Sequence, residues 1–68
     1  MKIFGERLKE LRNEKNLSQK DLAKILGTTN SSVCDWETDR AQPDMEMLVK
    51  LGDFFNVSID YLLGRTDI

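Results

Sequence analysis

A chain of 68 residues, of which 40% are hydrophobic, has room for one small domain built around one core. Cys34 is the only cysteine and there is no histidine, so an internal disulfide is excluded, and we expect neither a metal site nor another cofactor. The net charge of −2 does not by itself favour a polyanionic partner. No apolar run approaches the roughly 20 residues of a membrane span. We therefore expect a cytoplasmic protein without a membrane partner.

The charge is distributed unevenly along the chain. Residues 1–27 contain seven basic and four acidic side chains, whereas residues 28–68 contain three basic and eight acidic ones. Any anion-binding face is therefore expected to draw on the first third of the chain.

Five helices and no strand are predicted. The first spans residues 3–15, because Phe4, Leu8 and Leu11 recur at helical spacing and Asn16 can end the helix in a left-handed conformation. Ser18, with Asp21 three residues later, is a strong cap for a second helix that ends near Leu26.

The later elements are marked by similar signals. Thr29 is expected to cap a third helix that ends near Glu37, and a loop follows over residues 38–43. Asp44 caps a fourth helix, whose predicted wide inward stripe consists of Met45, Leu48, Val49, Leu51 and Phe55. Asn56 ends it, and residues 57–62 repeat the capping pattern of the second helix before Gly64. Residues 65–68 are expected to be a frayed tail.

The second and third helices have the pattern of a helix-turn-helix. Ala23 is small where two helices would cross, Gly27 suits the tight turn, and Val33 and Trp36 share the inner face of the third helix. The outer face is then left with an acid and no base, its residues being Thr29, Asn30, Ser31, Cys34, Asp35 and Thr38. In a helix-turn-helix, such a face can enter the major groove of DNA.

The spaced residues of this chain resemble the phage-repressor/Cro type of helix-turn-helix, the XRE-like family. The resemblance covers roughly residues 3–64 and rests on Leu17-Ser18-Gln19, Leu22-Ala23, Gly27, Val33, Trp36-Glu37, Pro43, Leu48, Leu51 and Val57 to Gly64. It implies an all-α, five-helix, lambda-repressor-like DNA-binding domain over residues 1–64, which binds a double-stranded DNA operator as a homodimer.

The resemblance also implies roles for individual side chains. The expected base-contacting residues are Asn30, Ser31, Cys34 and Asp35; the expected contacts to the DNA backbone are Ser18, Gln19, Thr29, Thr38 and Arg40. Asparagine can bond adenine, serine can bond almost any base, and aspartate can accept from cytosine or repel phosphates. For Glu37, a structural role that bonds Arg7 or Arg12 is one open alternative.

An apolar patch is expected near the turn between the fourth and fifth helices, since so small a domain cannot bury all of Phe54, Val57, Ile59 and Tyr61. The hypothesis is a dimer interface that spaces two recognition helices by about 34 Å, one turn of DNA. The alternative is ordinary core packing.

The predicted function is sequence-specific binding of double-stranded DNA in the major groove, as a homodimeric transcriptional repressor. Two alternatives stay open: an antitoxin whose second partner is a toxin protein, and a protein–protein adaptor that kept the fold. An enzyme is not expected, because the sequence has no histidine, no nucleophile–base pair and no phosphate-binding loop.

Overall fold

The computed structural model describes residues 2–68, which form five helices and no strand. The helices are α1 (Lys2–Glu14), α2 (Gln19–Leu26), α3 (Asn30–Glu37), α4 (Met45–Phe55) and α5 (Ile59–Leu62). This confirms the predicted all-α class and the order of the elements. None of these helices is long and apolar enough to cross a membrane.

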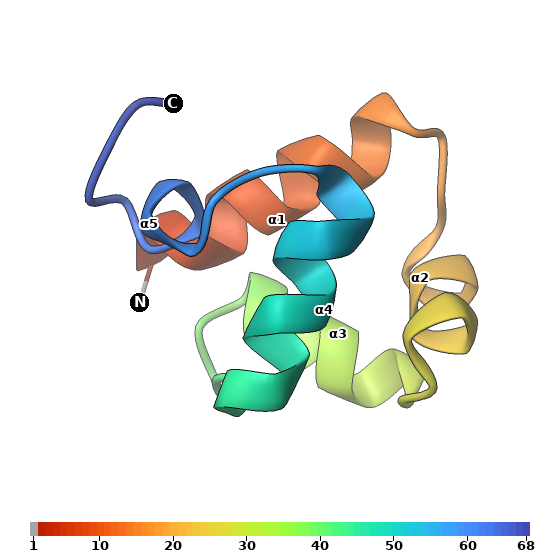
Figure 1. Ribbon diagram of the computed structural model, residues 1–68. Helices are drawn as coiled ribbons and strands as arrows, with labels where there is room; N and C mark the ends of the chain where they lie inside the picture. Colours follow the sequence, from red (N-terminus) through yellow and green to blue (C-terminus); the bar gives the residue numbers. More distant parts are fainter. Residues whose placement is uncertain (1) are drawn as a thin grey trace.

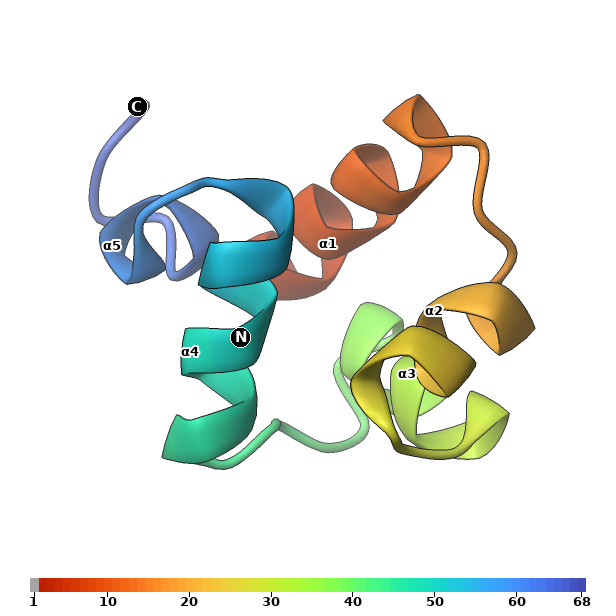
Figure 2. The ribbon, with the colours of Figure 1, turned by 45° about the vertical axis from the view of Figure 1, so that its right-hand side comes forward.

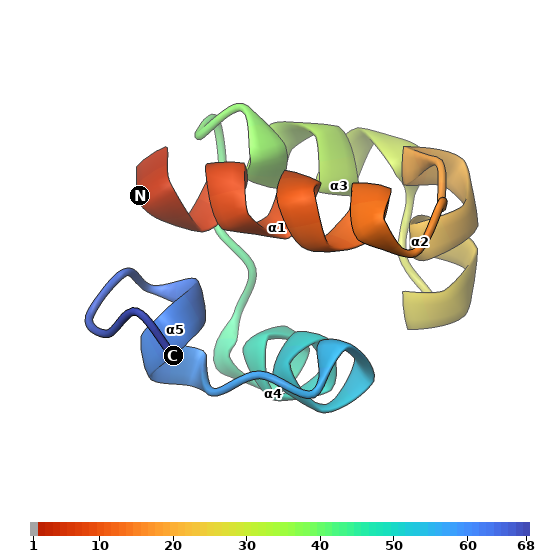
Figure 3. The same ribbon diagram turned by 90° about the horizontal axis from the view of Figure 1, so that it is seen from above.

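The helices pack in an order that differs from their order in the chain. α1 and α3 lie side by side in one layer, and α4 and α5 lie together on one face of that layer (Figures 1 and 3). α2 contacts both α3 and α4, and α5 contacts α1 and α4. As a result, α2 and α3 stand at the end of the molecule away from α5 (Figure 2).

The helix ends follow from local hydrogen bonds, as the sequence predicted. The side chains of Ser18, Thr29 and Asp44 each accept the backbone N–H of the residue three positions later. Asn16 and Asn56 end α1 and α4 with φ of 57°, the left-handed conformation that asparagine tolerates.

All five helices contribute to one core. Its buried side chains are Phe4, Leu8, Leu22, Ala23, Leu26, Val33, Trp36, Leu51, Phe55 and Leu62. Side chains of α1, α2 and α3 all belong to this core. The orientation of α3 is therefore determined by the packing of the whole domain and not by the turn alone.

The wide inward stripe predicted for α4 is wrong in two places. Met45 is 82% exposed and Val49 is 49% exposed, whereas Leu51 and Phe55 are buried and Leu48 is partly buried. A helix turns by about 100° per residue, which places Met45 and Val49 well to one side of the line that Leu48, Leu51 and Phe55 define. The buried stripe of α4 is therefore narrower than the run of apolar residues suggested.

Candidate nucleic-acid interface

The two helices α2 and α3 pack closely across a three-residue turn. Ala23 of α2 is buried, and Val33 and Trp36 of α3 belong to the same core. Gly27 begins the turn with φ of 75°, a conformation that glycine adopts without steric cost. The turn and the small side chain at the crossing hold α3 in a fixed position against α2.

The face of α3 opposite Val33 and Trp36 is open to solvent. Asn30, Ser31 and Thr38 are exposed, and Cys34 and Asp35 are half-buried. The structure thus brings the residues predicted to contact bases onto one surface, together with Thr38 at its end.

The first turns of α2 and α3 each retain backbone N–H groups without an intrahelical acceptor. The Ser18 hydroxyl accepts the Asp21 N–H at 3.0 Å, and the Thr29 hydroxyl accepts the Ser32 N–H at 3.1 Å. These caps satisfy one donor in each first turn, and the donors before them point outward at the positive end of the helix dipole. Such helix starts can bind phosphate oxygens.

The cap of α2 is reciprocal. The Ser18 backbone N–H donates to the Asp21 carboxylate at 3.1 Å. This bond is the main cause that lowers the pKa of Asp21 below its usual value, and hydrogen bonding between the Ser18 side chain and the carboxylate lowers it further. A lowered carboxyl pKa means that the charged form is favoured by folding. The contribution of this cap to stability is therefore present above the ordinary carboxyl pKa and is lost as the pH falls through the folded-state pKa.

A buried ion pair connects the end of α3 to α1 and α2. Arg12 donates to both oxygens of Glu37, at 2.7 Å from Nε and 3.0 Å from Nη2, and its Nη1 donates to the carbonyl of Leu17 at 2.7 Å. Gln19 Nε2 donates to Glu37 Oε1 at 3.1 Å. Hydrogen bonding to Glu37 raises the pKa of Arg12. The network fixes the end of α3 relative to the start of α2.

Arg12, not Arg7, is therefore the partner of Glu37. Arg7 instead bonds the carbonyl oxygens of Tyr61 and, at 2.7 Å, Thr66, and lies 3.5 Å from the Asp67 carboxylate. Its guanidinium also stacks 4.2 Å from the centroid of the Tyr61 ring. These contacts connect α1 to α5 and to the tail over residues 65–68.

Gly5 is a site residue that the sequence reasoning missed. A Cβ atom on Gly5 would lie 2.6 Å from the carbonyl oxygen of Glu37 and 2.8 Å from that of Trp36. Only glycine lets α1 approach the last turn of α3 this closely. A signal was available, because glycine inside a helix costs about 1 kcal/mol relative to alanine and so calls for a packing reason.

The segment of residues 38–41, which follows α3, hydrogen-bonds back to the carbonyl groups of its last turn. The Thr38 hydroxyl donates to the carbonyl of Cys34 at 2.8 Å, and the carbonyl of Asp35 accepts the Arg40 N–H at 2.9 Å. Asp39 has a positive φ of 64°. Arg40 is exposed, and its backbone is connected to the last turn of α3 by the hydrogen bond to Asp35.

The four residues predicted for a dimer interface have different surroundings. Phe54 packs edge-on against Phe55, with ring centroids 4.9 Å apart, and lies under the ammonium of Lys15. Tyr61 is half-buried beneath Arg7, and Val57 is also half-buried, whereas Ile59 is 36% exposed. Ile59 is thus the most accessible member of the predicted patch.

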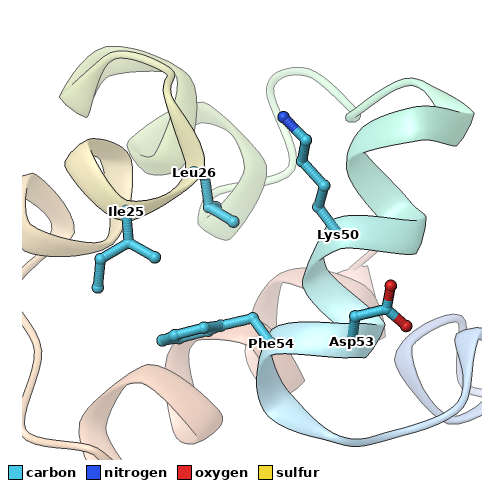
Figure 4. Close-up of a pocket in the computed structure, with 5 residues that line it drawn as sticks. All are labelled: Ile25, Leu26, Lys50, Asp53 and Phe54. Atoms are coloured by element: carbon cyan, nitrogen blue, oxygen red, sulfur yellow. The ribbon is translucent and has the colours of Figure 1, made fainter.

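A shallow groove of about 370 Å³ lies between α2 and α4 (Figure 4). It is lined by Ile25, Leu26, Lys50, Asp53 and Phe54, so no residue of α3 contributes to it. Within residues 2–68 no group of three or more metal-ligating side chains is assembled, here or elsewhere.

Comparison with known proteins gives one consistent result. A family model described as "Helix-turn-helix" matches residues 8–62. The chain is 41% identical over 65 residues to the HTH-type transcriptional regulator ImmR of Bacillus subtilis, covering 96% of this chain and 51% of ImmR. It is 33% identical over 61 residues to repressor protein C2 of Salmonella phage P22, covering 90% of this chain and 28% of C2. The chain thus spans about half of ImmR and less of C2.

Solved structures agree with these relatives. A crystal structure of the P22 c2 repressor in complex with a synthetic operator matches with a TM-score of 0.83 and 31% identity, over 91% of this chain and 94% of that one. A solution structure of the DNA-binding domain of the same repressor matches with a TM-score of 0.80 and 33% identity, over 90% of this chain and 80% of that one.

Proposed function

The chain belongs to the helix-turn-helix family, and on that premise we propose that it is a transcriptional regulator of the phage-repressor type that binds a double-stranded DNA operator by placing α3 in the major groove. The observation that carries the proposal is the division of α3 into two faces. Val33 and Trp36 are held in the core, while on the outer face Asn30, Ser31 and Thr38 are exposed and Cys34 and Asp35 are half-buried. The likeness to a repressor bound to a synthetic operator supports operator DNA as the partner.

Phosphate contacts are assigned to the surroundings of α3, since its outer face carries no base. The first turns of α2 and α3 offer backbone N–H groups, and Lys20, Lys24 and Arg40 are exposed nearby in sequence. Gln19 keeps its amide oxygen and one N–H while its other N–H braces Glu37. Because the face of α3 that would enter the major groove of DNA carries no basic side chain, we expect a shallow dependence of DNA affinity on salt concentration.

Truncation of Asn30 and truncation of Gln19 are expected to change DNA binding in different ways. Asn30→Ala should relax the preference at one base position, at a cost of about 1–3 kcal/mol for the preferred base, because asparagine can bond adenine through two atoms. Gln19→Ala should weaken binding to all sequences about equally, because phosphate contacts carry no sequence information. Electrophoretic mobility-shift titrations against a set of single-base operator variants measure both effects.

Both variants need unchanged circular dichroism as a control, since Gln19 also bonds the buried Glu37. If the wild-type chain shows no salt-sensitive binding to any double-stranded fragment of a genomic library, the DNA-binding proposal is wrong.

We further propose that two copies bind a pseudo-palindromic operator through contacts at the α4–α5 turn, with Ile59 at the centre. Ile59 projects from α5 and is accessible, and Val57 precedes it on the same turn. Burial of apolar side chains between two copies would make binding to a full site stronger than binding to two separate half-sites.

Ile59→Glu should lower the ratio of full-site to half-site affinity by at least about tenfold, or roughly 1.4 kcal/mol. Ile25→Glu is a matched control, since Ile25 is 51% exposed but lies in the groove between α2 and α4. An equal ratio for Ile59→Glu and the wild-type chain would place the dimer contact elsewhere.

A further inference from the structure

Asp35 is the acidic side chain on the outer face of α3, and nothing in the fold explains its charge. It is half-buried, and its carboxylate has no hydrogen bond or ion pair to any of residues 2–68. Its backbone carbonyl, by contrast, accepts the N–H groups of Arg40 at 2.9 Å and Ala41 at 3.3 Å. The backbone at this position therefore has a structural role, whereas the carboxylate makes no polar contact within residues 2–68.

The position of Asp35 within α3 is unfavourable for an anion. It lies in the last turn of the helix, at the negative end of the helix dipole, and that turn contains no basic residue. Glu37, the other acid of the same turn, is compensated by Arg12. An acidic residue in the last turn of a helix with no basic partner is unfavourable for stability, and such unfavourable choices are expected at functional positions more often than elsewhere.

The same charge is also unfavourable on a surface that approaches DNA, because a carboxylate repels phosphates. Only a hydrogen-bond donor on a base edge can offset that cost. In the major groove the donors are the amino groups of cytosine and adenine, and adenine presents its N7 acceptor beside its amino group. A carboxylate is therefore matched better by cytosine than by any other base.

We propose that Asp35 selects a cytosine in each half-site and weakens binding to DNA that lacks it. The inference rests on the proposed function and assigns the chemistry of one contact within it. Ser31 and Asp35 are four residues apart on the outer face, about 6 Å along the helix axis, and base pairs are spaced by about 3.4 Å. Because a helix in the major groove is inclined to the DNA axis, the selected cytosine is expected about one to two base pairs from the base that the first turn of α3 faces.

The two effects of Asp35 have opposite signs, which makes the proposal testable. Removal of the carboxylate should abolish one base preference and at the same time strengthen binding to unrelated DNA. A side chain that only repelled DNA would change the second quantity and not the first. A side chain that only packed would change neither.

The experiment is a selection from a randomised double-stranded DNA pool with the wild-type chain, Asp35→Ala and Asp35→Asn. The wild-type chain should prefer cytosine at one position by about tenfold over the other bases. Asp35→Ala should lose that preference, and Asp35→Asn should change it to adenine, because an amide can pair with both N6 and N7 of adenine.

The second readout is the affinity for one fixed unrelated duplex at low salt. Asp35→Ala should bind it about fivefold more tightly than the wild-type chain, the factor given by roughly 1 kcal/mol between two charges at close range in water. Glu46→Ala is the charge-matched control, because Glu46 is exposed on α4 and its loss changes the net charge equally. It should leave the base preference unchanged and the affinity nearly so.

The outcomes separate the two levels of the proposal. If the selected position keeps its preference in both Asp35 variants, Asp35 does not read a base and the inference is wrong, while DNA binding stands. If the wild-type chain enriches no sequence at all, the proposed function fails, and the inference fails with it. Circular dichroism should show Asp35→Ala to be at least as helical as the wild-type chain, since alanine is the better helix former.

Discussion

Glu37→Ala is expected to leave much of the chain unfolded at 25 °C. The Glu37 side chain is 2% exposed and accepts hydrogen bonds from Arg12 and Gln19, so its removal leaves the buried guanidinium of Arg12 without a counter-charge. Breaking a buried ion pair by removing one partner costs about 3–5 kcal/mol. A domain of this size without a disulfide or metal has a total stability of about the same magnitude.

Urea denaturation followed by circular dichroism measures this effect, with Glu10→Ala as the control. Glu10 is exposed on α1, and its loss should change the free energy of unfolding by no more than about 0.5 kcal/mol.

The double variant Arg12→Met with Glu37→Leu provides a further test of the cause. Replacing both charges by apolar groups of similar size is often neutral or stabilising, so this variant should recover most of the stability that Glu37→Ala loses. If Glu37→Ala alone costs less than about 1 kcal/mol, the ion pair is not what holds the end of α3.

Gly5→Ala is expected to destabilise the fold by a net amount of about 1–2 kcal/mol, although alanine is the better helix former, because an overpacking cost of about 1–3 kcal/mol exceeds the gain in helix propensity. The gain in helix propensity is about 1 kcal/mol. The added Cβ would meet the carbonyl oxygens of Glu37 and Trp36 at 2.6 and 2.8 Å, and backbone atoms cannot move aside as the end of a flexible side chain can. Overpacking of this kind forces α1 and α3 apart.

Trp36 provides the readout for this displacement. It is 6% exposed, and its fluorescence emission should shift to longer wavelength as water reaches the last turn of α3. Gly27→Ala is the contrasting variant. A Cβ there has no atom within 4 Å, so its cost comes only from φ of 75°, about 1–2 kcal/mol, and the tryptophan emission should not move. An unshifted spectrum and unchanged stability for Gly5→Ala would contradict the close packing of α1 on α3.

Features that depend on neighbours in sequence were predictable. The caps at Ser18, Thr29 and Asp44, the left-handed residues Asn16 and Asn56, and the extents of the helices all follow from interactions within four residues. Because each helix boundary was fixed locally, the division of α3 into a buried and an open face could be predicted from its periodicity as well.

Other features depend on contacts between helices, and periodicity could not decide them. The choice between Arg12 and Arg7 as the partner of Glu37 required the packing of α1 beside α3, and the exposure of Met45 and Val49 depended on how much of the apolar arc of α4 the neighbouring helices cover. Helical periodicity predicts which residues share a face of a helix, but it does not predict how much of that face is buried by the neighbouring helices.

The sequence by itself determined the five helices, the helix-turn-helix and the outward position of Asn30, Ser31 and Asp35, because these depend on capping and on a period of 3.6 residues. The tertiary structure alone decided that Gly5 admits the end of α3 and that Glu37 is compensated while Asp35 is not. The physical reason is that pairing of charges and close approach of backbones depend on distances between segments far apart in the chain, which no local pattern encodes.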